Sequence, residues 1–406
     1  MSGLGIQGEL INEENAPKIA VIGCGSHSFR NIFPTFQYLN IELVATCDLI
    51  EEKAQRYARQ FGAQKFYTDY RIMLQNETLD GVIMVLGYGS KGEPLYPEIV
   101  NDVLKKGVSV WIEKPPAANS MLIEEFIESE KQSNGSFLQV GFKKMFMPSS
   151  IEMKNIIDSE SFGKPTSYYM KYNVDLPHDS SDLRLPSSRR FIDDYVHVAS
   201  MQQFLFGPAS KVIYFNNSDE SGFANFFYES GLIGTVHFSR SSSKLSPIER
   251  IEVIGEGENV IMDNNIDIRY YSKGNIGPYG STPSYIPKSG SVKIFSPEFS
   301  LGQLYNKGLF LLGYYNEMKY FVDNLRLKMK PKKAGSEDAL AVMKYIDSFT
   351  AGSGKMNDFG HYHVNSNRIN VNKEVLKCEN CGENSMYLKD GWNYTCVICG
   401  NTISAD

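Results

Sequence analysis

The sequence predicts an α/β protein: an N-terminal doubly wound parallel sheet, a second α+β domain with a large, open, mostly antiparallel sheet, and a small C-terminal metal-binding module. Three observations lead to this prediction. Short apolar runs alternate with helix-forming segments over the first 145 residues, as is typical of parallel sheets. From about Gly163 the chain becomes β-rich without long helices between the strands, which favours antiparallel pairing. Four of the six cysteines lie beyond residue 377.

The N-terminal domain is expected over residues 17–145, after a polar leader at residues 1–16. Lys18 to Ile22 is a continuous apolar run typical of a buried parallel strand. The pattern then predicts a helix at 32–39, a strand at 41–47, a helix at 51–61, a strand at 81–86, a helix at 97–106 and a strand at 108–112.

The second domain is expected over residues 146–350. Its predicted strands lie at 166–174, 211–216, 224–227, 232–238, 251–255 and 266–271, and its helices at 191–206, 314–327 and 336–349. Residues 274–300 are rich in Gly, Ser and Pro and are expected to form a long loop. Residues 351–377 are expected to be a linker into a terminal module at 378–406.

Composition excludes several classes of protein. The 406 residues fit two or three domains, and the net charge of -6 argues against a chain-wide nucleic-acid or anionic-lipid surface. No apolar run is long enough for a membrane span, and the first seventeen residues lack the features of a signal peptide. The sequence thus predicts a soluble, reduced, cytoplasmic protein, although nucleic-acid binding through a local patch stays open.

The turn after the first strand has the pattern of a dinucleotide site. The first of its two glycines permits a tight turn, the second lets a pyrophosphate approach the backbone, and the following helix offers its free N–H groups. The expected cofactor contacts in this turn are Gly23, Gly25, Ser26, His27 and Ser28. Asp48 ends the next strand, where a carboxylate can bind an adenosine ribose. Because Leu49 rather than an arginine follows it, NAD is favoured over NADP; the alternative is a structural loop with a solvated Asp48.

Candidate catalytic residues lie at two distant points of the chain. Lys114 follows the predicted strand at 108–112, at the edge of the sheet where ligands collect. Asp193 and His197 are four residues apart and share one face of a predicted helix. An imidazole and a carboxylate so placed suit proton transfer. Taken singly, Lys114 is more typical of a surface lysine and His197 of a structural helix histidine.

Together these residues resemble one family. Gly23-Cys24-Gly25, Asp48, Glu113-Lys114-Pro115 and the Asp193-x-x-x-His197 helix, in this order, are similar to the glucose-fructose oxidoreductase, inositol dehydrogenase and MocA (Gfo/Idh/MocA) family. The resemblance covers roughly residues 17 to 350. It implies a Rossmann domain, a second domain whose open sheet forms dimers or tetramers, and oxidation of a ring hydroxyl on a sugar, sugar phosphate, nucleotide sugar or cyclitol.

The resemblance also implies roles for single residues. Lys114 would hydrogen-bond the reacting oxygen, His197 would take its proton as hydride leaves for NAD, and Asp193 would orient or share that proton. Glu113 would sit beside the nicotinamide, and Arg184 would lie near the substrate. The chain departs from the family at Ser28, Asn31, Tyr96, Ser187 to Arg190 and Ser200.

Three arginines near the catalytic helix bear on the substrate. Arg184, Arg189 and Arg190 could form a fork for a phosphate or carboxylate, which favours a phosphorylated or nucleotide-linked sugar. The alternative is a solvated basic turn that pairs with Asp179, Asp182 or Asp194.

The C-terminal cysteines form two CxxCG motifs, and their four thiolates suit tetrahedral structural zinc. The expected ligands are Cys378, Cys381, Cys396 and Cys399, in a segment that resembles a zinc ribbon. Free thiols or disulfides are the alternative. Five basic residues stand against six acidic ones from residue 351 onwards, so contact with a protein is favoured over nucleic acid.

Two functions therefore compete. One is an NAD-dependent sugar or cyclitol dehydrogenase that acts as a homodimer or homotetramer. The other is a catalytically silent NAD-binding sensor or scaffold that acts through its zinc ribbon.

Overall fold

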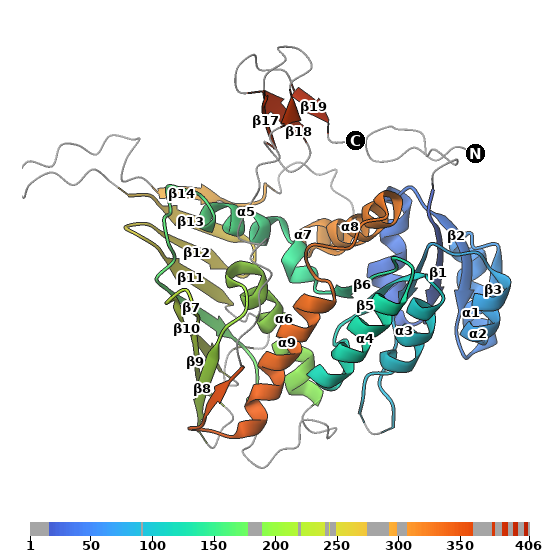
Figure 1. Ribbon diagram of the computed structural model, residues 1–406, viewed down its shortest axis with the longest axis horizontal. Coiled ribbons are helices and arrows are strands. Elements are labelled where there is room, and N and C mark those ends of the chain that lie inside the picture. Colours follow the sequence, from blue (N-terminus) through green and yellow to red (C-terminus); the bar gives the residue numbers. More distant parts are fainter. Residues whose placement is uncertain are drawn as a thin grey trace, which may run out of the picture. The chain divides into compact units, whose positions relative to one another are not determined.

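A computed structural model describes residues 16–90, 92–177, 189–217, 221–239, 243, 249–273, 292–298 and 307–359, and four short strands nearer the C-terminus. The chain divides into two compact units, Met1–Gly360 and His361–Asp406. Figure 1 shows the two large sheets of the first unit. Within the described residues, no helix combines the length and the apolar character that crossing a bilayer requires.

The first sheet is six-stranded and wholly parallel, in the order β3-β2-β1-β4-β5-β6. Its strands are β1 (Lys18–Ile22), β2 (Glu42–Cys47), β3 (Lys65–Tyr67), β4 (Gly81–Met84), β5 (Ser109–Glu113) and β6 (Leu138–Gly141). This order is that of a dinucleotide-binding Rossmann sheet and confirms the predicted doubly wound fold. The helices between the strands are α1 (Glu51–Phe61), α2 (Tyr70–Asn76), α3 (Tyr96–Lys105) and α4 (Ser120–Gln132).

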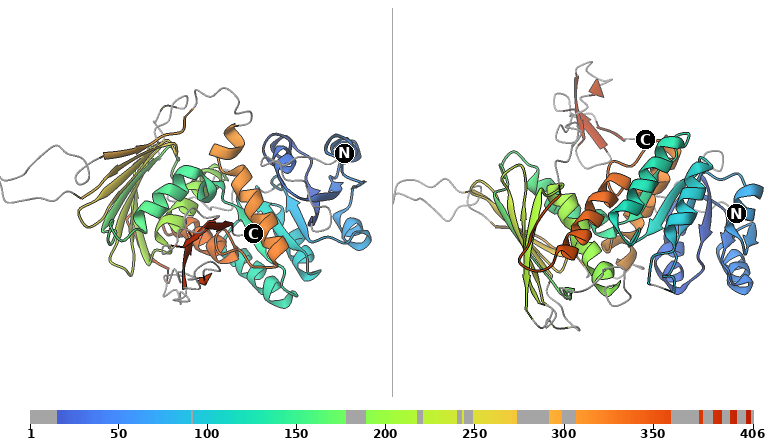
Figure 2. Two further views of the ribbon diagram at one scale, coloured as in Figure 1. Left: turned by 90° about the horizontal axis from the view of Figure 1, so that it is seen from above. Right: turned by 60° about the horizontal axis from the view of Figure 1, so that its bottom comes forward.

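The two faces of this sheet are covered by elements from distant parts of the chain (Figure 2). Helices α3 and α4 pack on one face. On the other face, α8 (Tyr314–Leu327) packs Met318 and Phe321 against Trp111 of β5, and all three side chains are fully buried. One face of the parallel sheet is therefore covered by α8, a helix that lies near the C-terminal end of this unit in the sequence.

The segment after β1 is helical but irregular. A helix is predicted at 32–39, whereas the structure forms a π-helical turn over Ser28–Ile32 and a 3-10 helix over Phe33–Tyr38. Pro34 lies at the start of the 3-10 helix. It lacks the N–H that a regular α-helix would use, which accounts for the change of helix type.

The second sheet has nine strands in the order β14-β13-β12-β11-β7-β10-β9-β8-β15. Only the β7–β10 pair is parallel among the strand pairs described, so the expectation of a mostly antiparallel sheet is confirmed. The strands are β7 (Ser167–Tyr172), β8 (Lys211–Asn216), β9 (Gly222–Phe227), β10 (Ile233–Phe238), β11 (Arg250–Ile254), β12 (Asn259–Asp263), β13 (Asp267–Tyr271), β14 (Val292–Phe295) and β15 (Met356–Asp358).

Helices lie between the two sheets in Figure 1, among them α5 (Pro148–Ile157), α6 (Arg189–Phe206) and α9 (Ser336–Asp347). The 3-10 turn η4 (Lys143–Phe146) and the short α7 (Lys307–Leu311) complete this layer. Helix α6 is amphipathic and buries Phe191 and Tyr195 against Phe349. Its first turns thereby bring Asp193 and His197 toward the carboxyl ends of the parallel strands.

Two strands occupy segments predicted to be irregular. Strand β14 lies inside the predicted loop at 274–300, and its four residues are exposed, which leaves no burial pattern to reveal it. Strand β15 lies inside the predicted linker at 351–377 and pairs with β8. The Phe359 ring packs on Tyr345 of α9, which explains why the chain stays on the second sheet up to this point.

The second unit contains a four-stranded antiparallel sheet in the order β16-β17-β18-β19. Its strands are β16 (Leu376–Lys377), β17 (Asn384–Leu388), β18 (Asn393–Cys396) and β19 (Thr402–Ser404). Cys396 ends β18, whereas Cys378, Cys381 and Cys399 lie outside the described residues. Zinc ligation is thus untested by the structure.

Candidate functional site

The turn after β1 requires its first glycine. Gly23 has a φ of +99°, and a Cβ placed there would lie 2.1 Å from the Val85 carbonyl oxygen. Gly25 is different, because a Cβ there would meet no atom within 4 Å. The fold itself therefore demands a glycine at position 23 but not at position 25. The open space at Gly25 fits the approach of a pyrophosphate to the backbone.

Asp48 ends β2 and supports this turn. Its Oδ2 accepts from the Cys24 N–H at 2.8 Å, and its Oδ1 accepts from the Ile50 N–H at 2.9 Å. A carboxylate offers about four lone-pair positions. Two of them remain for the hydroxyls of a ribose, so Asp48 fits the predicted role.

Ser28 has a structural role. It is fully buried, and its hydroxyl donates to the Gly23 carbonyl at 2.6 Å. The Ser28 hydroxyl is therefore engaged within the turn itself. Ser28 ties the helical segment to the turn, as the Tyr57 hydroxyl does by donating to the Gly25 carbonyl at 2.8 Å.

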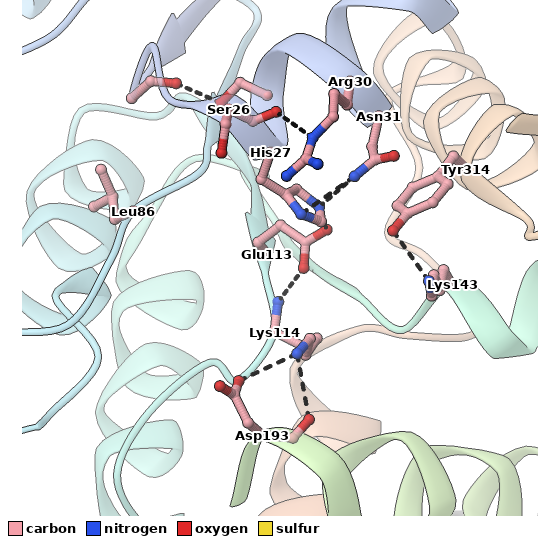
Figure 3. Close-up of polar contacts among 12 residues, drawn as sticks. Ser26, His27, Arg30, Asn31, Leu86, Glu113, Lys114, Lys143, Asp193 and Tyr314 are labelled. Carbon is pink, nitrogen blue, oxygen red and sulfur yellow. Dashed lines mark hydrogen bonds and ion pairs between the residues drawn. The ribbon is translucent and has the colours of Figure 1, made fainter. Parts of the chain in front are cut away.

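His27 and Glu113 meet across the cofactor turn and the end of β5 (Figure 3). His27 Nε2 lies 2.8 Å from Glu113 Oε1, and Asn31 Nδ2 lies 3.2 Å from His27 Nδ1. Glu113 is buried, and its second oxygen accepts from the Lys114 N–H at 2.9 Å. The two predicted cofactor residues thus hold each other, and Glu113 also fixes the backbone of Lys114.

Lys114 is held by Asp193 from α6. Its Nζ donates to Asp193 Oδ1 at 3.1 Å and to the Asp193 carbonyl at 3.3 Å (Figure 3). The Tyr88 hydroxyl donates to the same Oδ1. Tyr88 follows β4, so three residues from the ends of β4 and β5 and from α6 converge here.

His197 lies one turn beyond Asp193 on α6. Its half-buried ring forms no hydrogen bond within the described part of the chain, and the carboxylate of Asp193 contacts Lys114 and Tyr88 instead. Burial lowers the pKa of His197 well below 6.5, and the positive charges of Lys114 and Lys144 lower it further. At neutral pH the imidazole is therefore uncharged and can accept a proton.

The two described arginines of the predicted fork, Arg189 and Arg190, make different contacts. Arg190 Nη1 lies 3.3 Å from Asp175 and its Nε lies 3.7 Å from Asp194. The contact with Asp194 is one of the ion pairs expected if these arginines form a solvated basic turn. Arg189 instead stacks on the Tyr88 ring, with Cζ 3.9 Å from the ring centroid. Arg184 lies outside the described residues.

Four further residues of this site are not in the sequence-based prediction. Lys143 Nζ donates to the Tyr314 hydroxyl at 3.0 Å, and the Tyr314 ring packs edge-on against His27 (Figure 3). Lys144 Nζ donates to Glu249 at 2.6 Å. Lys143, Lys144 and Tyr88 lie within four residues of the ends of parallel strands. The rule that ligands collect at carboxyl strand ends could therefore have identified them. The sequence does not indicate that Tyr314 belongs to this site, because Tyr314 is the first residue of α8 and does not follow a parallel strand.

The two cysteines of this region are not reactive groups. Burial, together with the negative charge of the neighbouring Asp48 carboxylate, raises the pKa of both Cys24 and Cys47 to about 12. Both thiols are buried and remain protonated at neutral pH. The candidate chemistry therefore rests on Lys114, Asp193 and His197.

Comparison with known proteins finds two curated relatives that are similar to part of this chain. The first of two curated relatives is an inositol 2-dehydrogenase/D-chiro-inositol 3-dehydrogenase of Lactiplantibacillus plantarum, 29% identical over 48% of this chain and 53% of its own length. The second, a scyllo-inositol 2-dehydrogenase (NAD(+)) of Bacillus subtilis, is 27% identical over 60% of this chain and 72% of its own length. The match thus spans about half the length of the first relative.

A solved structure shows that the fold continues through the second sheet. A levoglucosan dehydrogenase, in complex with NADH and L-sorbose, aligns with a TM-score of 0.69 at 15% identity and covers 86% of this chain and 100% of its own. Residues 17–142 match the family model described as "Oxidoreductase family, NAD-binding Rossmann fold". Over these residues the chain is therefore similar to the NAD-binding Rossmann domain of the Gfo/Idh/MocA oxidoreductases.

Proposed function

We propose that the protein is an NAD-dependent oxidoreductase that moves hydride between nicotinamide and a ring hydroxyl or ketone of a sugar, sugar phosphate, nucleotide sugar or cyclitol. The observation that carries the proposal is the Lys114–Asp193 pair, 3.1 Å apart, next to an uncharged His197 at the carboxyl ends of the parallel strands. The inositol dehydrogenases among its relatives support the same chemistry.

The cofactor would be held by the turn after β1. Gly25 and the N–H groups from Ser26 onward would receive the pyrophosphate, and Asp48 would bind the adenosine ribose. His27 and Glu113 would lie toward the nicotinamide end. When bound, NAD supplies the hydride acceptor, and the chain supplies position and proton transfer.

His197 would act as the general base in oxidation. The imidazole would take the proton of the reacting hydroxyl while the hydrogen on the same carbon leaves as hydride, so that an alcohol becomes a ketone. In reduction, protonated His197 would return the proton to the new alkoxide. Its depressed pKa favours the first direction at neutral pH.

Lys114 and Asp193 would position and polarise the reacting oxygen. The ammonium of Lys114 is fixed by the two hydrogen bonds that it donates to Asp193. It can therefore offer its remaining N–H to the substrate at little entropic cost. A cation there favours the alkoxide character that develops as the proton leaves. Asp193 would act mainly through Lys114, because no bond joins it to His197 among the described residues.

A substrate panel tests this function. Purified full-length protein with NAD is mixed with cyclitols, aldoses, sugar phosphates and nucleotide sugars, and formation of reduced nicotinamide is followed by absorbance. Turnover of at least one compound supports the proposal. Tight NAD binding with no turnover across the panel would favour the silent sensor or scaffold instead.

Asp48 should set the preference for NAD. We expect Asp48→Ala to reduce NAD affinity about tenfold, through loss of the ribose hydrogen bonds. Its effect on NADP should be smaller, because removal of the carboxylate also removes repulsion of the 2′-phosphate. Titration of both cofactors by fluorescence measures the ratio. Asp69→Ala, at an exposed helix cap nearby, serves as the control. An unchanged ratio in Asp48→Ala would contradict the role of Asp48.

Two further assignments remain proposals. The large sheet carries the exposed side chains of Phe215, Phe223 and Ile233 on its strands, and it would provide the surface for a homodimer or homotetramer. The unit at His361–Asp406 would bind one structural zinc and serve in protein contacts.

Zinc content is directly measurable. We expect metal analysis of the full chain to find one zinc per chain, and Cys381→Ser to lower this value strongly, because a serine hydroxyl is a poor ligand for zinc. Cys47→Ala, which removes a buried cysteine of the parallel sheet, should leave the zinc content unchanged. A zinc-free wild-type chain purified without chelator would refute the metal site.

A further inference from the structure

Arg189 occupies an unusual position at the start of α6. Its side chain is exposed, and its guanidinium lies over the face of the Tyr88 ring at 3.9 Å from the centroid. Stacking fixes the plane of an arginine while leaving its N–H donors at the edge free for other partners. The stack on Tyr88 therefore orients the guanidinium.

The neighbouring charges of this surface are paired. Arg190 contacts Asp175 and Asp194, and Lys114 is paired with Asp193. Among the residues that the structure describes, no carboxylate lies within salt-bridge distance of Arg189. Within the described part of the chain, the Tyr88 ring is thus the contact recorded for the Arg189 guanidinium.

Arg189 is also linked to the reacting groups. The Tyr88 ring on which it stacks donates its hydroxyl to Asp193 Oδ1, and the same oxygen accepts from Lys114 Nζ at 3.1 Å. Burial first and the Asp193 carboxylate second raise the pKa of Tyr88 above its usual range, so the phenol stays a donor. A substrate whose hydroxyl lies at Lys114 would extend across Tyr88 to the guanidinium.

We propose that Arg189 binds an anionic group of the substrate, a carboxylate or a phosphate, carried by the part of the molecule that does not react. This inference rests on the proposed function and narrows it: the preferred substrates are acidic or phosphorylated sugars and cyclitols rather than neutral ones. The single planar cation of Arg189 is sufficient for this recognition. The planar guanidinium matches both anions with two parallel hydrogen bonds.

The test compares matched compounds that differ only in charge. A neutral hexose, the corresponding uronate and the corresponding sugar phosphate are assayed with NAD and wild-type protein, with Arg189→Ala and with Arg189→Lys. We expect Arg189→Ala to lower kcat/KM for the anionic member that is used by about 10- to 100-fold, the range for a charged hydrogen-bonded pair. The neutral hexose should change less than about twofold, and Arg189→Lys should restore part of the loss.

The control removes an equivalent stack elsewhere. Arg71 lies over the Tyr70 ring at 4.6 Å and also pairs with Glu98 and Asp102, so Arg71→Ala removes an arginine–tyrosine stack together with two ion pairs on α2 and α3. It should leave all three rates unchanged. An equal loss for neutral and anionic compounds in Arg189→Ala would show that Arg189 only supports Tyr88, and no loss at all would show a solvated side chain. Either result would overturn the proposal.

A binding measurement separates this proposal from the dehydrogenase function. Each compound is titrated calorimetrically into the protein saturated with NADH. If nothing in the panel is oxidised, yet the uronate or sugar phosphate binds and Arg189→Ala abolishes that binding, the anion site stands and the dehydrogenase proposal fails. If the neutral hexose binds and reacts as well as its anionic partners, the dehydrogenase proposal stands and the anion site is refuted.

Discussion

Replacement of His197 by alanine is expected to lower the turnover of alcohol oxidation by about 10²- to 10⁴-fold, the usual contribution of a general base. The affinity for NAD should be nearly unchanged, because His197 lies on α6 and the cofactor turn lies after β1. Steady-state rates with the best panel substrate, together with NAD titration, measure both quantities. His237→Ala is the matched control, since His237 lies on the second sheet and bonds Tyr169 instead.

The role of His197 as a base also predicts how kcat/KM depends on pH. Burial keeps the pKa of His197 well below 6.5 in the folded protein, so oxidation should be independent of His197 protonation at pH 7. As pH falls through the depressed pKa, the base becomes protonated and kcat/KM should decline. This acidic limb should vanish in His197→Ala. A variant that keeps both the wild-type rate and the limb would rule out His197 as the base.

The same group links pH to stability. The unfolded chain binds a proton at His197 near pH 6.5, whereas the folded protein does not, so the unfolded state holds more protons below this pH. The free energy of unfolding should therefore decrease as pH falls below about 6.5. Part of that decrease should be absent in His197→Ala.

Much of the fold follows from local sequence patterns. Strands β1, β2, β4 and β5 are predictable because strands buried on both faces appear as continuous apolar runs. Strand β3 escapes prediction because it is three residues long and mostly exposed. The position of α8 cannot be predicted at all: its pattern indicates that one face is buried, but not that this face covers the parallel sheet.

The candidate site is predictable to a similar degree. The spacing of Asp193 and His197 correctly predicts that they share a helical face near Lys114. It does not predict that Lys114 and Tyr88 donate hydrogen bonds to the Asp193 carboxylate, because those contacts depend on how α6 packs against the ends of β4 and β5. For the same reason, the sequence does not predict that Arg189 stacks on Tyr88 while Arg190 pairs with Asp175 and Asp194.

Substitution of Gly23 by alanine should cost both stability and cofactor binding. The left-handed φ of +99° is unfavourable for alanine, and its Cβ would lie 2.1 Å from the Val85 carbonyl oxygen, so the turn and the loop after β4 must separate. We expect the free energy of unfolding to fall by about 3 kcal/mol, from backbone strain and overpacking together. Denaturant unfolding measures the loss, and NAD binding should disappear with the shape of the turn.

Gly25→Ala separates the two effects, because a Cβ at this position meets no atom within 4 Å in the protein itself. The free energy of unfolding should stay within about 0.5 kcal/mol of the wild-type value. NAD affinity should nevertheless fall about 100-fold, or about 2.8 kcal/mol, since the new methyl group occupies the space that the pyrophosphate needs. A stable Gly25→Ala protein with unchanged NAD affinity would mean that the pyrophosphate does not lie against this turn. A Gly25→Ala protein as unstable as Gly23→Ala would mean that position 25 is closed by the fold and not kept open for a ligand.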